Sequence, residues 1–459
     1  MTPRLLLLTV ASIVVVVVAN NSMGALAQPE IQREYAVGPA DVGWVVFGFS
    51  AAFAVATALW GALGRRFGIS RALAAGVLLL SGASLAAALA PDLPTLIAAR
   101  VVQGLGAGAI PTLGTSLVGS RFDGAQRVAA LGTIVAGVGV GQAIGPILGG
   151  ALIDLAGWRA VVGFSVVAAP GALAVALART GRGDARARID LLGVLLVLLA
   201  AGAAVLLLNR GPVLGVVPLT LAATAVLALA LPALAWHSAR RGGRLVPREV
   251  VLHPTYRRLV VLGAVGMAAF LGSIVIVPTA VAAAHGLSGL ALGVLLVPMA
   301  VATALTAPNA GRVARRLGRV ATTRYALGLL ALGPLLLAVV GADGPTAALS
   351  AAMVPLGLGF GLLNAPLLDE LMHTFAGDVS PTAVGAYNLL FFFGGSLGAS
   401  LASALLQQQV FVPGVSDVVG AGFGTVAVLL ALVPAVTVVL ALLRPLRART
   451  SPPPLAQDT

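Results

Sequence analysis

Few residues in this chain of 459 could perform acid–base, nucleophilic or metal chemistry, and their spacing favours none of it. The four histidines are far apart, so no pair at helical spacing suggests a metal site; they are His237, His253, His285 and His373. Cysteine is absent, which excludes disulfides and thiolate ligands. Lysine is absent too, and with it the phosphate-binding loop GxxxxGK[ST]. The sequence therefore predicts a protein that is not an enzyme and holds no metal or cofactor.

The composition predicts a membrane protein. The chain is 59% hydrophobic and only 9% charged, whereas a soluble domain carries roughly 25% charged residues. A membrane-spanning helix needs about 20 mostly apolar residues. Fourteen segments qualify: 5–27, 41–62, 72–90, 93–115, 127–153, 159–178, 191–208, 213–236, 259–283, 288–310, 322–341, 346–371, 381–407 and 419–443. The first resembles a secretory signal, but the thirteen that follow favour a retained helix.

The arginines predict the orientation of these segments. With a cytoplasmic N-terminus, 24 of the 28 arginines fall in cytoplasmic links or at the two termini. Because cationic residues resist translocation, this bias fixes topology. The net charge of +13 then faces the anionic lipids of the inner leaflet rather than nucleic acid. We expect a multi-pass protein of a bacterial-type inner membrane with both termini in the cytoplasm.

One arginine-rich junction occurs twice. It reads GALGRRFG at residues 61–68 and GRVARRLG at residues 311–318. Both copies follow a segment that runs from outside to inside. If segments 7 and 8 are an inserted pair, each copy follows the second helix of a six-helix half. Parallel halves with a site between them near the midplane are a known transporter plan; the alternative is chance recurrence in arginine-rich links.

The junction resembles the loop between helices 2 and 3 of the major facilitator superfamily. RVVQGLGAGAIP at 100–111 is similar to that family's helix-4 motif, and GVGVGQAIGPILGG at 137–150 to the helix-5 motif of its exporters. DLLGVLLVLLAAG at 190–202 resembles the start of the extra helix pair in the fourteen-helix drug:proton antiporters. VGAYNLLFFFGGSLGASLASALL at 384–406 is similar to the tetracycline-efflux branch. The resemblance implies an all-α membrane protein with the major-facilitator fold.

The helix-5 motif carries small residues on one face of a helix. Gly137, Gly141, Gly145 and Gly149 recur every four residues, and Pro146 interrupts the helix beside them. Small residues let helices approach closely in lipid. We expect a smooth, bent surface on which the two halves rock, the alternative being an ordinary tight helix contact. The resemblance implies export rather than import.

Arg100 is the charged residue placed deepest in an apolar segment, and it costs several kcal/mol there unless it is paired or hydrated. By helix rise, Arg100 lies about 10 Å from the outer end of that segment. The alternative to a functional role is therefore that its side chain snorkels to the membrane surface. Asn20 and Asn21 are expected at a similar depth, and Gln103 lies nearly one turn further in. Glu30 can carry a proton but sits near the outer end of the first segment, and the alternative is an ordinary solvated residue. The resemblance implies that Arg100, Gln103 and Glu30 couple proton movement to conformational change.

Several acids that the resemblance implies are missing. The helix 2–3 loop of the family carries an aspartate where this chain has Arg65, although Arg71 matches a basic position of that loop. Gln142 stands where the tetracycline branch has an acid in helix 5. Another acid is missing near Gly394 or Gly395, so tetracycline itself is a doubtful substrate. Asp369, beside Glu370 near the inner end of segment 12, is the remaining candidate for coupling or gating. The alternative is a solvated helix end.

A substrate cavity should combine apolar walls with a few polar groups. The candidates within or near the segments are Asn20, Asn21, Gln28, Gln142, Asn364, Tyr387, Asn388 and Phe391. The alternative for each polar residue is a structural contact between two helices.

Taken together, we expect an exporter of small hydrophobic or amphiphilic compounds, powered by proton antiport. Its expected parts are a six-helix bundle (1–190), an inserted helix pair (191–236), a cytoplasmic linker (237–258), a second six-helix bundle (259–443) and a disordered tail (444–459). Its partners would be a small-molecule substrate and membrane lipid, with no nucleic acid and no obligatory protein partner. The alternatives are a facilitator or proton symporter on the same fold, and a membrane enzyme or assembly subunit, which no catalytic cluster supports.

Overall fold

A computed structural model describes residues 2–443 except 25, 38, 178–190, 209–216, 241–247, 288, 376–379 and 408. Helices make up its regular secondary structure throughout these residues. The predicted linker is therefore only partly covered, and the tail at 444–459 lies outside the described residues.

The first part of the chain forms one group of packed helices. In chain order it contains α1 (Pro3–Met23), α2 (Gln28–Tyr35), α3 (Pro39–Phe67), α4 (Ile69–Ala88), α5 (Leu93–Ala107), η1 (Ile110–Gly114), α6 (Thr115–Gly119), α7 (Gly124–Gly163), η2 (Phe164–Ala168) and α8 (Ala169–Leu177). Predicted segments 5 and 6 meet inside α7, where Gly157 breaks the helix with φ 72° and ψ 179°. That backbone conformation suits glycine because it has no side chain.

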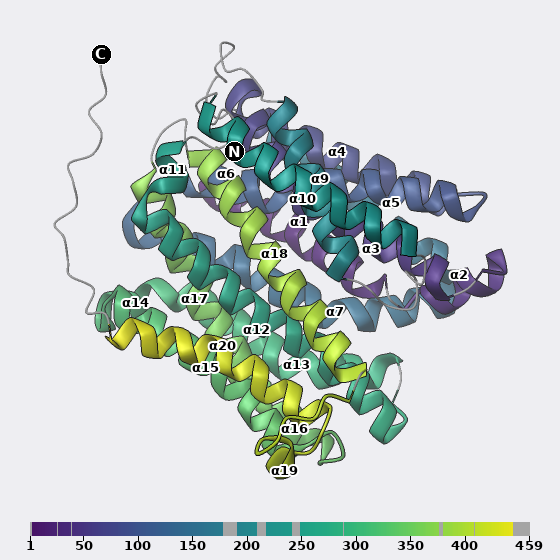
Figure 1. Ribbon diagram of the computed structural model, residues 1–459. Helices are drawn as coiled ribbons and strands as arrows, with labels where there is room; N and C mark the ends of the chain where they lie inside the picture. The colour runs from purple at the N-terminus through teal and green to yellow at the C-terminus, as the bar shows by residue number, and fades with distance from the viewer. Residues whose placement is uncertain are drawn as a thin grey trace.

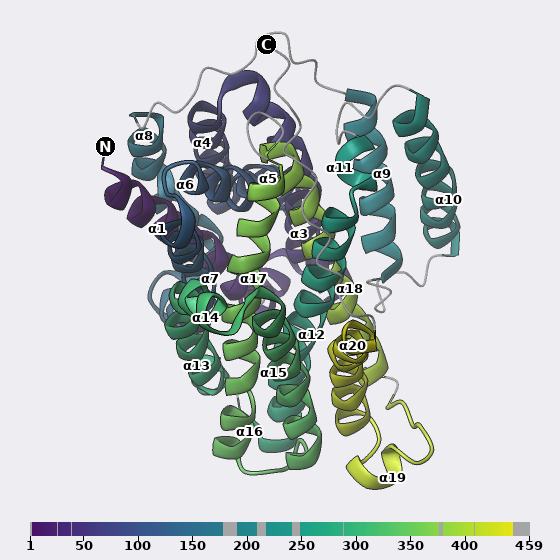
Figure 2. The ribbon, with the colours of Figure 1, turned by 90° about the vertical axis from the view of Figure 1, so that its left-hand side faces the viewer.

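Two further helices, α9 (Leu191–Leu208) and α10 (Val217–Arg240), pack against each other. α9 contacts both α3 and α18, so the pair lies beside the junction of the two halves. In Figure 2 these helices stand together at one side of the molecule.

The last part of the chain forms the second half. It contains α11 (Arg248–Leu252), α12 (Pro254–His285), α13 (Gly289–Thr306), η4 (Ala307–Asn309), α14 (Ala310–Leu317), α15 (Arg319–Val340), α16 (Thr346–Ala352), α17 (Val354–Thr374), α18 (Ser380–Gln407), α19 (Ser416–Val419) and α20 (Phe423–Leu443). The purple-to-blue first half and the green-to-yellow second half occupy different sides of the molecule in Figure 1.

Membrane-spanning character is clear along much of the chain. Within the described residues, nine helical stretches are long and apolar enough to cross a bilayer. The count of fourteen spans stays a prediction. Each half buries its own apolar core, but Val128, Leu131 and Val135 of α7 belong to the core of the second half. α7 therefore links the two halves through packing.

The two arginine-rich junctions have the same backbone shape. Gly68 joins α3 to α4 with φ 89° and ψ 142°, and Gly318 joins α14 to α15 with φ 84° and ψ 150°. Residues with a Cβ rarely adopt positive φ, so the final glycine of each motif is required by a sharp turn between two helices.

The two halves touch mainly toward their arginine-rich ends. α3 packs against α18, and α7 packs against α13 and α17. The closest backbone approaches join Gly61 to Pro381, Gly385 to Thr57 and Gly132 to Ala307. Near the midpoints of α3 and α18, Phe53 meets Phe392 with ring centroids 4.9 Å apart. We call this contact region the seam.

Candidate functional site

Arg100 of α5 lies at the centre of a buried polar cluster and is only 1% exposed. Its Nε donates to the Val45 carbonyl at 3.1 Å, and its Nη1 donates to Asn20 Oδ1 at 3.1 Å and Gln103 Oε1 at 2.7 Å. The guanidinium carbon also lies 4.5 Å from the ring centroid of Phe49. Neutral oxygens and one aromatic face thus solvate the charge.

Gln103 and Asn20 extend this cluster to neighbouring helices. Gln103 Nε2 donates to Ser84 Oγ at 2.9 Å and to the Val162 carbonyl at 3.2 Å, while Asn20 Nδ2 donates to the Val161 carbonyl at 2.7 Å. The cluster therefore ties α1, α4, α5 and α7 together. Asn21, which was expected at the same depth, is exposed.

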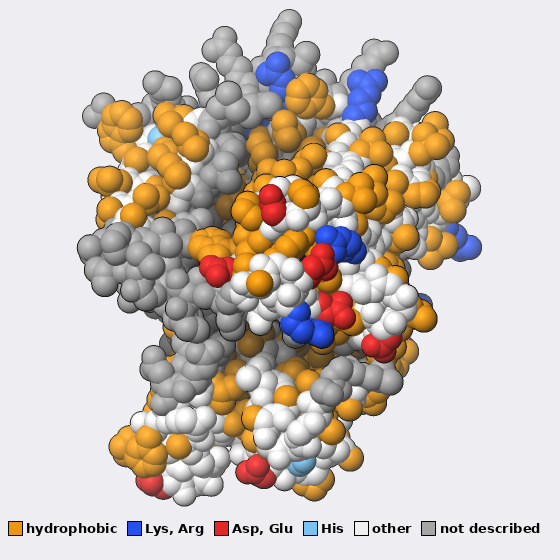
Figure 3. All heavy atoms as spheres, turned by 90° about the vertical axis from the view of Figure 1, so that its right-hand side faces the viewer, with side chains coloured by type: hydrophobic (Ala, Val, Ile, Leu, Met, Phe, Trp, Pro, Cys, Tyr) orange, Lys and Arg blue, Asp and Glu red, His pale blue; other side chains and the backbone are white. Residues whose placement is uncertain are grey.

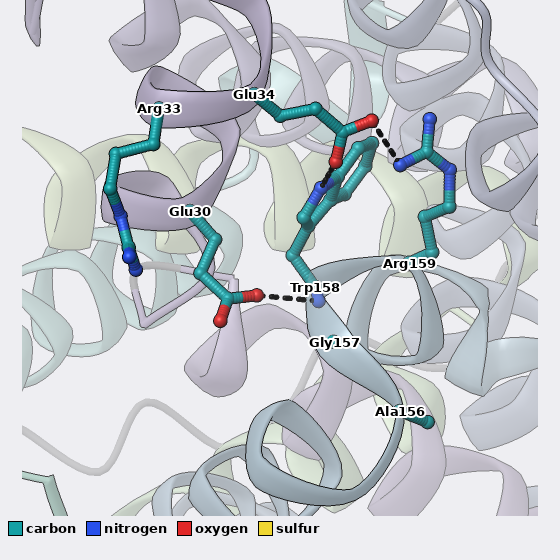
Figure 4. Close-up of a pocket in the computed structure, with 7 residues that line it drawn as sticks. All are labelled: Glu30, Arg33, Glu34, Ala156, Gly157, Trp158 and Arg159. Atoms are coloured by element: carbon teal, nitrogen blue, oxygen red, sulfur yellow. Dashed lines mark hydrogen bonds and ion pairs between the residues drawn. The ribbon is translucent and has the colours of Figure 1, made fainter.

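Glu30 takes part in a separate site on α2. Its Oε2 accepts the backbone N–H of Trp158 at 2.9 Å, directly after the break at Gly157. A helix segment that starts after a break leaves its first N–H groups without helical partners, and a carboxylate satisfies one of them well. Glu30 therefore caps the outer segment of α7, as Figure 4 shows.

Glu34, one helical turn along α2, completes a contact that we call the outer clasp: Glu30 and Glu34 with Trp158 and Arg159. Glu34 accepts from Trp158 Nε1 at 2.6 Å and from Arg159 Nη1 at 2.5 Å. The Arg159 hydrogen bond, with that of Trp158, holds the pKa of the Glu34 carboxyl below its usual value. The clasp lines an open hollow of about 500 Å³, on a face where acidic and basic side chains gather (Figure 3).

Three of the helix-5 glycines, Gly137, Gly141 and Gly149, lie against α1 of the same half. An added Cβ would lie 3.2 Å from the Ala11 carbonyl at Gly137, 2.8 Å from the Val15 carbonyl at Gly141 and 2.7 Å from Met23 Cβ at Gly149. All three neighbours belong to α1, which is in the same half. These glycines therefore serve a tight α1–α7 contact rather than the seam, because the glycine face of α7 turns toward α1. Gly145 is buried in α7, and the side chain of Pro146 lies outside the described residues.

Other glycines of α7 face the opposite half. A Cβ at Gly132 would lie 1.9 Å from the Ala307 carbonyl oxygen, and one at Gly139 would lie 3.0 Å from Thr303 Cβ. Gly132 stands outside the helix-5 motif, and Gly139 belongs to it but breaks the four-residue spacing. In the described arrangement the seam surface of α7 therefore includes Gly132 and Gly139.

Asp369 of α17 connects the halves by charge and is 7% exposed. Its carboxylate oxygens lie 3.8 Å from Arg127 Nε of α7 and 3.6 Å from Arg319 Nη2 of α15. The neighbouring Glu370 accepts from Arg258 within the second half. Arg71, in contrast, is exposed at the start of α4. Sequence reasoning missed Arg127, since nothing near it in sequence indicates an acid from the other half.

Polar and aromatic groups of α17 and α18 form a second cluster near the seam. Tyr387 donates to Asn364 Oδ1 at 3.4 Å, and Asn388 Nδ2 donates to Thr112 Oγ1 of the first half at 3.5 Å. Phe391 lies 5.7 Å from the Tyr387 ring, between centroids. Four of the predicted cavity residues thus gather in one place.

The remaining predicted cavity residues lie elsewhere. Gln28 is the first residue of α2 and is partly buried. Gln142 of α7 is also partly buried, and its Oε1 has no hydrogen-bond partner among the described residues. The predicted set is therefore distributed over both halves.

A comparison with models of protein families identifies the family of this chain. The model of the Major Facilitator Superfamily matches residues 8–399, which is most of the chain. The chain belongs to the Major Facilitator Superfamily. The sequence-based prediction of family and of an all-α membrane fold is therefore confirmed.

Curated relatives within this superfamily cover most of the chain. It is 29% identical over 392 residues to the multidrug resistance protein Stp of Mycobacterium tuberculosis, with 83% of this chain and 72% of the relative covered. It is 28% identical over 410 residues to the tetracenomycin C resistance and export protein of Streptomyces glaucescens, with 88% and 76% covered. The drug efflux pump JefA of M. tuberculosis is 27% identical, with 88% and 81% covered.

Solved structures share the fold at low identity. The human organic anion transporter MFSD10 superposes with a TM-score of 0.67 at 16% identity, covering 95% of this chain and all of that one. The proton:xylose symporter XylE superposes with a TM-score of 0.66 at 14% identity, covering 95% of both chains. These likenesses describe the major-facilitator fold alone.

Proposed function

We propose that this protein exports small hydrophobic or amphiphilic compounds, antibiotics among them, across a bacterial inner membrane. The observation that carries the proposal is the similarity to three export or resistance proteins over 83–88% of the chain. The exporter-type helix-5 motif supports the same direction of transport. In this proposal the arginine-rich end faces the cytoplasm, with both termini on that side.

The proposed mechanism is alternating access between the bundles 1–190 and 259–443, with the pair 191–236 beside them. The halves meet at the arginine-rich end through Gly61, Gly132 and Gly385. That arrangement supports an outward-facing state, closed toward the cytoplasm. Substrate binding changes such an equilibrium only through different affinities for the two states.

The proposed energy source is the proton gradient, used by antiport. The proposed coupling groups are acids at both ends of the bundle. Glu30 would take up a proton from outside, and its neutral form would hold the Trp158 N–H of α7 less strongly. Asp369 would act at the opposite end. Its ionised form attracts Arg127 across the seam and closes the cytoplasmic side.

A facilitator or proton symporter is the second candidate. The observation that favours it is the absence of mid-span acids at Gln142 and at Gly394 or Gly395, where the resemblance implied them. A facilitator needs no residue that carries protons.

Everted membrane vesicles test the proposal. Respiration acidifies their interior, and a pH-sensitive dye reports the gradient. We expect tetracenomycin C or another amphiphilic antibiotic to dissipate the gradient only in vesicles that contain the protein. Movement of labelled compound without any change in the gradient would support the facilitator, and no movement of any compound would contradict export.

A further inference from the structure

Arg100 has a terminal nitrogen that no partner satisfies. Its Nη2 is buried and has no hydrogen-bond acceptor among the described residues, although Nε and Nη1 are both bonded. The nitrogen lies toward Gly24, where an added Cβ would be 3.4 Å away. A guanidinium presents a fork of donors that matches a carboxylate in a bidentate geometry. One arm of that fork is unused here.

No carboxylate neutralises this cation in the described part of the chain. The groups that surround Arg100 are the Val45 carbonyl, two side-chain amides and the Phe49 ring. The C-terminal end of α1, which reaches Met23, contributes only a partial negative charge. Buried cations in a membrane protein are normally paired or face a substrate path.

The sequence offers no acid that could supply the missing charge at this depth. The acids among the described residues of the first half lie at helix ends or breaks: Glu30, Glu34, Asp41, Asp92, Asp123 and Asp154. Asp184 and Asp190 lie outside the described residues. Glu30 and Glu34 are already engaged by Trp158 and Arg159. The described residues therefore solvate Arg100 with neutral groups but give it no counter-charge.

We propose that the exported compounds carry an acidic group, ionised as a carboxylate, phenolate or enolate, that binds Arg100 during transport. The anion would bind Nη2, since the oxygens of Gln103 and Asn20 already accept from Nη1 and their N–H groups donate to Ser84 and to backbone carbonyls. The Phe49 ring provides an apolar, aromatic surface next to the charge. This assignment rests on the proposed export function and names the substrate class.

An anionic substrate also changes the energetics of export. A membrane potential of 100 mV, negative inside, favours the exit of one negative charge by about 50-fold in concentration ratio. Such a compound leaves the cell down the electrical gradient even where no mid-span acid carries a proton. Export against a concentration gradient is then possible without those acids.

The test uses three probes with one aromatic body and different charge: 1-pyrenebutyrate, 1-pyrenebutanol and 1-pyrenebutyl-trimethylammonium. Their accumulation is measured in everted vesicles with and without the protein, at a fixed membrane potential. We expect the wild type to accumulate pyrenebutyrate about 10-fold more than the other two above the protein-free background. Arg100→Gln should remove that preference, and Arg100→Lys should retain part of it.

Arg4→Gln is the matched control, because Arg4 is exposed at the start of α1, at the opposite end of that helix from Asn20, and should leave the preference intact. Folding of each variant is checked by its thermal unfolding temperature, and binding of the three probes to purified protein in nanodiscs gives a second measurement of the preference. Equal accumulation of all three probes, or a preference that survives Arg100→Gln, would overturn the anion assignment while export stands. If none of the probes or antibiotics accumulates, the export function fails as well.

Discussion

Gly61 and Gly311 lie about 250 residues apart and occupy matching places, each against the opposite half. A Cβ at Gly61 would be 2.7 Å from the carbonyl oxygen of Pro381, and one at Gly311 would be 2.8 Å from Val128 Cβ. The repeated junction thus has two glycines with separate tasks. The first permits close approach across the seam, and the last provides the turn with positive φ.

Gly132 provides the sharpest test of the seam. Gly132→Val would place a side chain against the Ala307 backbone, and a backbone carbonyl cannot move aside as a flexible side chain does. Overpacking of this kind costs about 1–3 kcal/mol, so we expect the closed state to lose roughly 5- to 150-fold in population. The seam should open at its arginine-rich end.

The measurement is the distance between spin labels at Phe67→Cys and Leu317→Cys, two exposed positions that end α3 and α14. The chain has no cysteine of its own, so the labels are unique. Gly150→Val is the control on the same helix, since an added Cβ there meets nothing within 4 Å. An unchanged distance in Gly132→Val would contradict the role of this contact.

Asp369→Asn tests the charge contact between the halves. The amide keeps the size of the carboxylate but loses its attraction for Arg127 and Arg319. Asp369 is buried, but the Arg319 side chain is 57% exposed and both N···O distances exceed 3.5 Å. Such loose, partly solvated pairs are worth about 1 kcal/mol or less, so we expect the closed state to weaken by up to about fivefold. The same pair of labels reports the change.

Glu370→Gln is its matched control, because that carboxylate pairs with Arg258 inside one half and should leave the label distance unchanged. High salt should reproduce part of the Asp369→Asn effect in the wild type, since screening weakens exposed pairs. A larger increase in the label distance in Glu370→Gln than in Asp369→Asn would reject Asp369 as the gate residue.

The sequence predicted the family and helical architecture because both follow from long apolar segments and local motifs. It could also identify Arg100 as unusual, since a charge inside an apolar segment is visible in the sequence. It could not place the helix-5 glycines, because a spacing of four defines a face but not the helix that the face meets. Arg127 and Gly132 were missed for the same reason: their partners, Asp369 and Ala307, are distant in the chain.

Glu30→Gln tests the proton assignment. Glutamine can still accept the Trp158 N–H through its amide oxygen, so the cap at the Gly157 break is retained while the titratable group is lost. We expect the variant to fold normally and to lose proton-coupled export in the vesicle dye assay, while downhill movement of substrate persists. Glu34→Gln, one turn away, should keep coupling because Glu34 is bound to Arg159. Normal coupling in Glu30→Gln would show that Glu30 is only a helix cap.

Glu34 determines how the outer clasp should respond to pH. Its folded-state pKa lies below the usual value because Arg159 and Trp158 bind the ionised form. Its contribution to the free energy of unfolding is therefore fully present above the unfolded pKa of about 4.3 and is lost as the pH falls through the lower folded value. We expect Glu34→Gln to lower the thermal unfolding temperature at pH 7 and to lower it by less at pH 3. The effect at pH 7 should be small, since the Glu34 side chain is 42% exposed and such pairs contribute about 0.2–1 kcal/mol. A difference between the two proteins that is the same at both pH values would mean that packing, not the charge, holds α2 against α7.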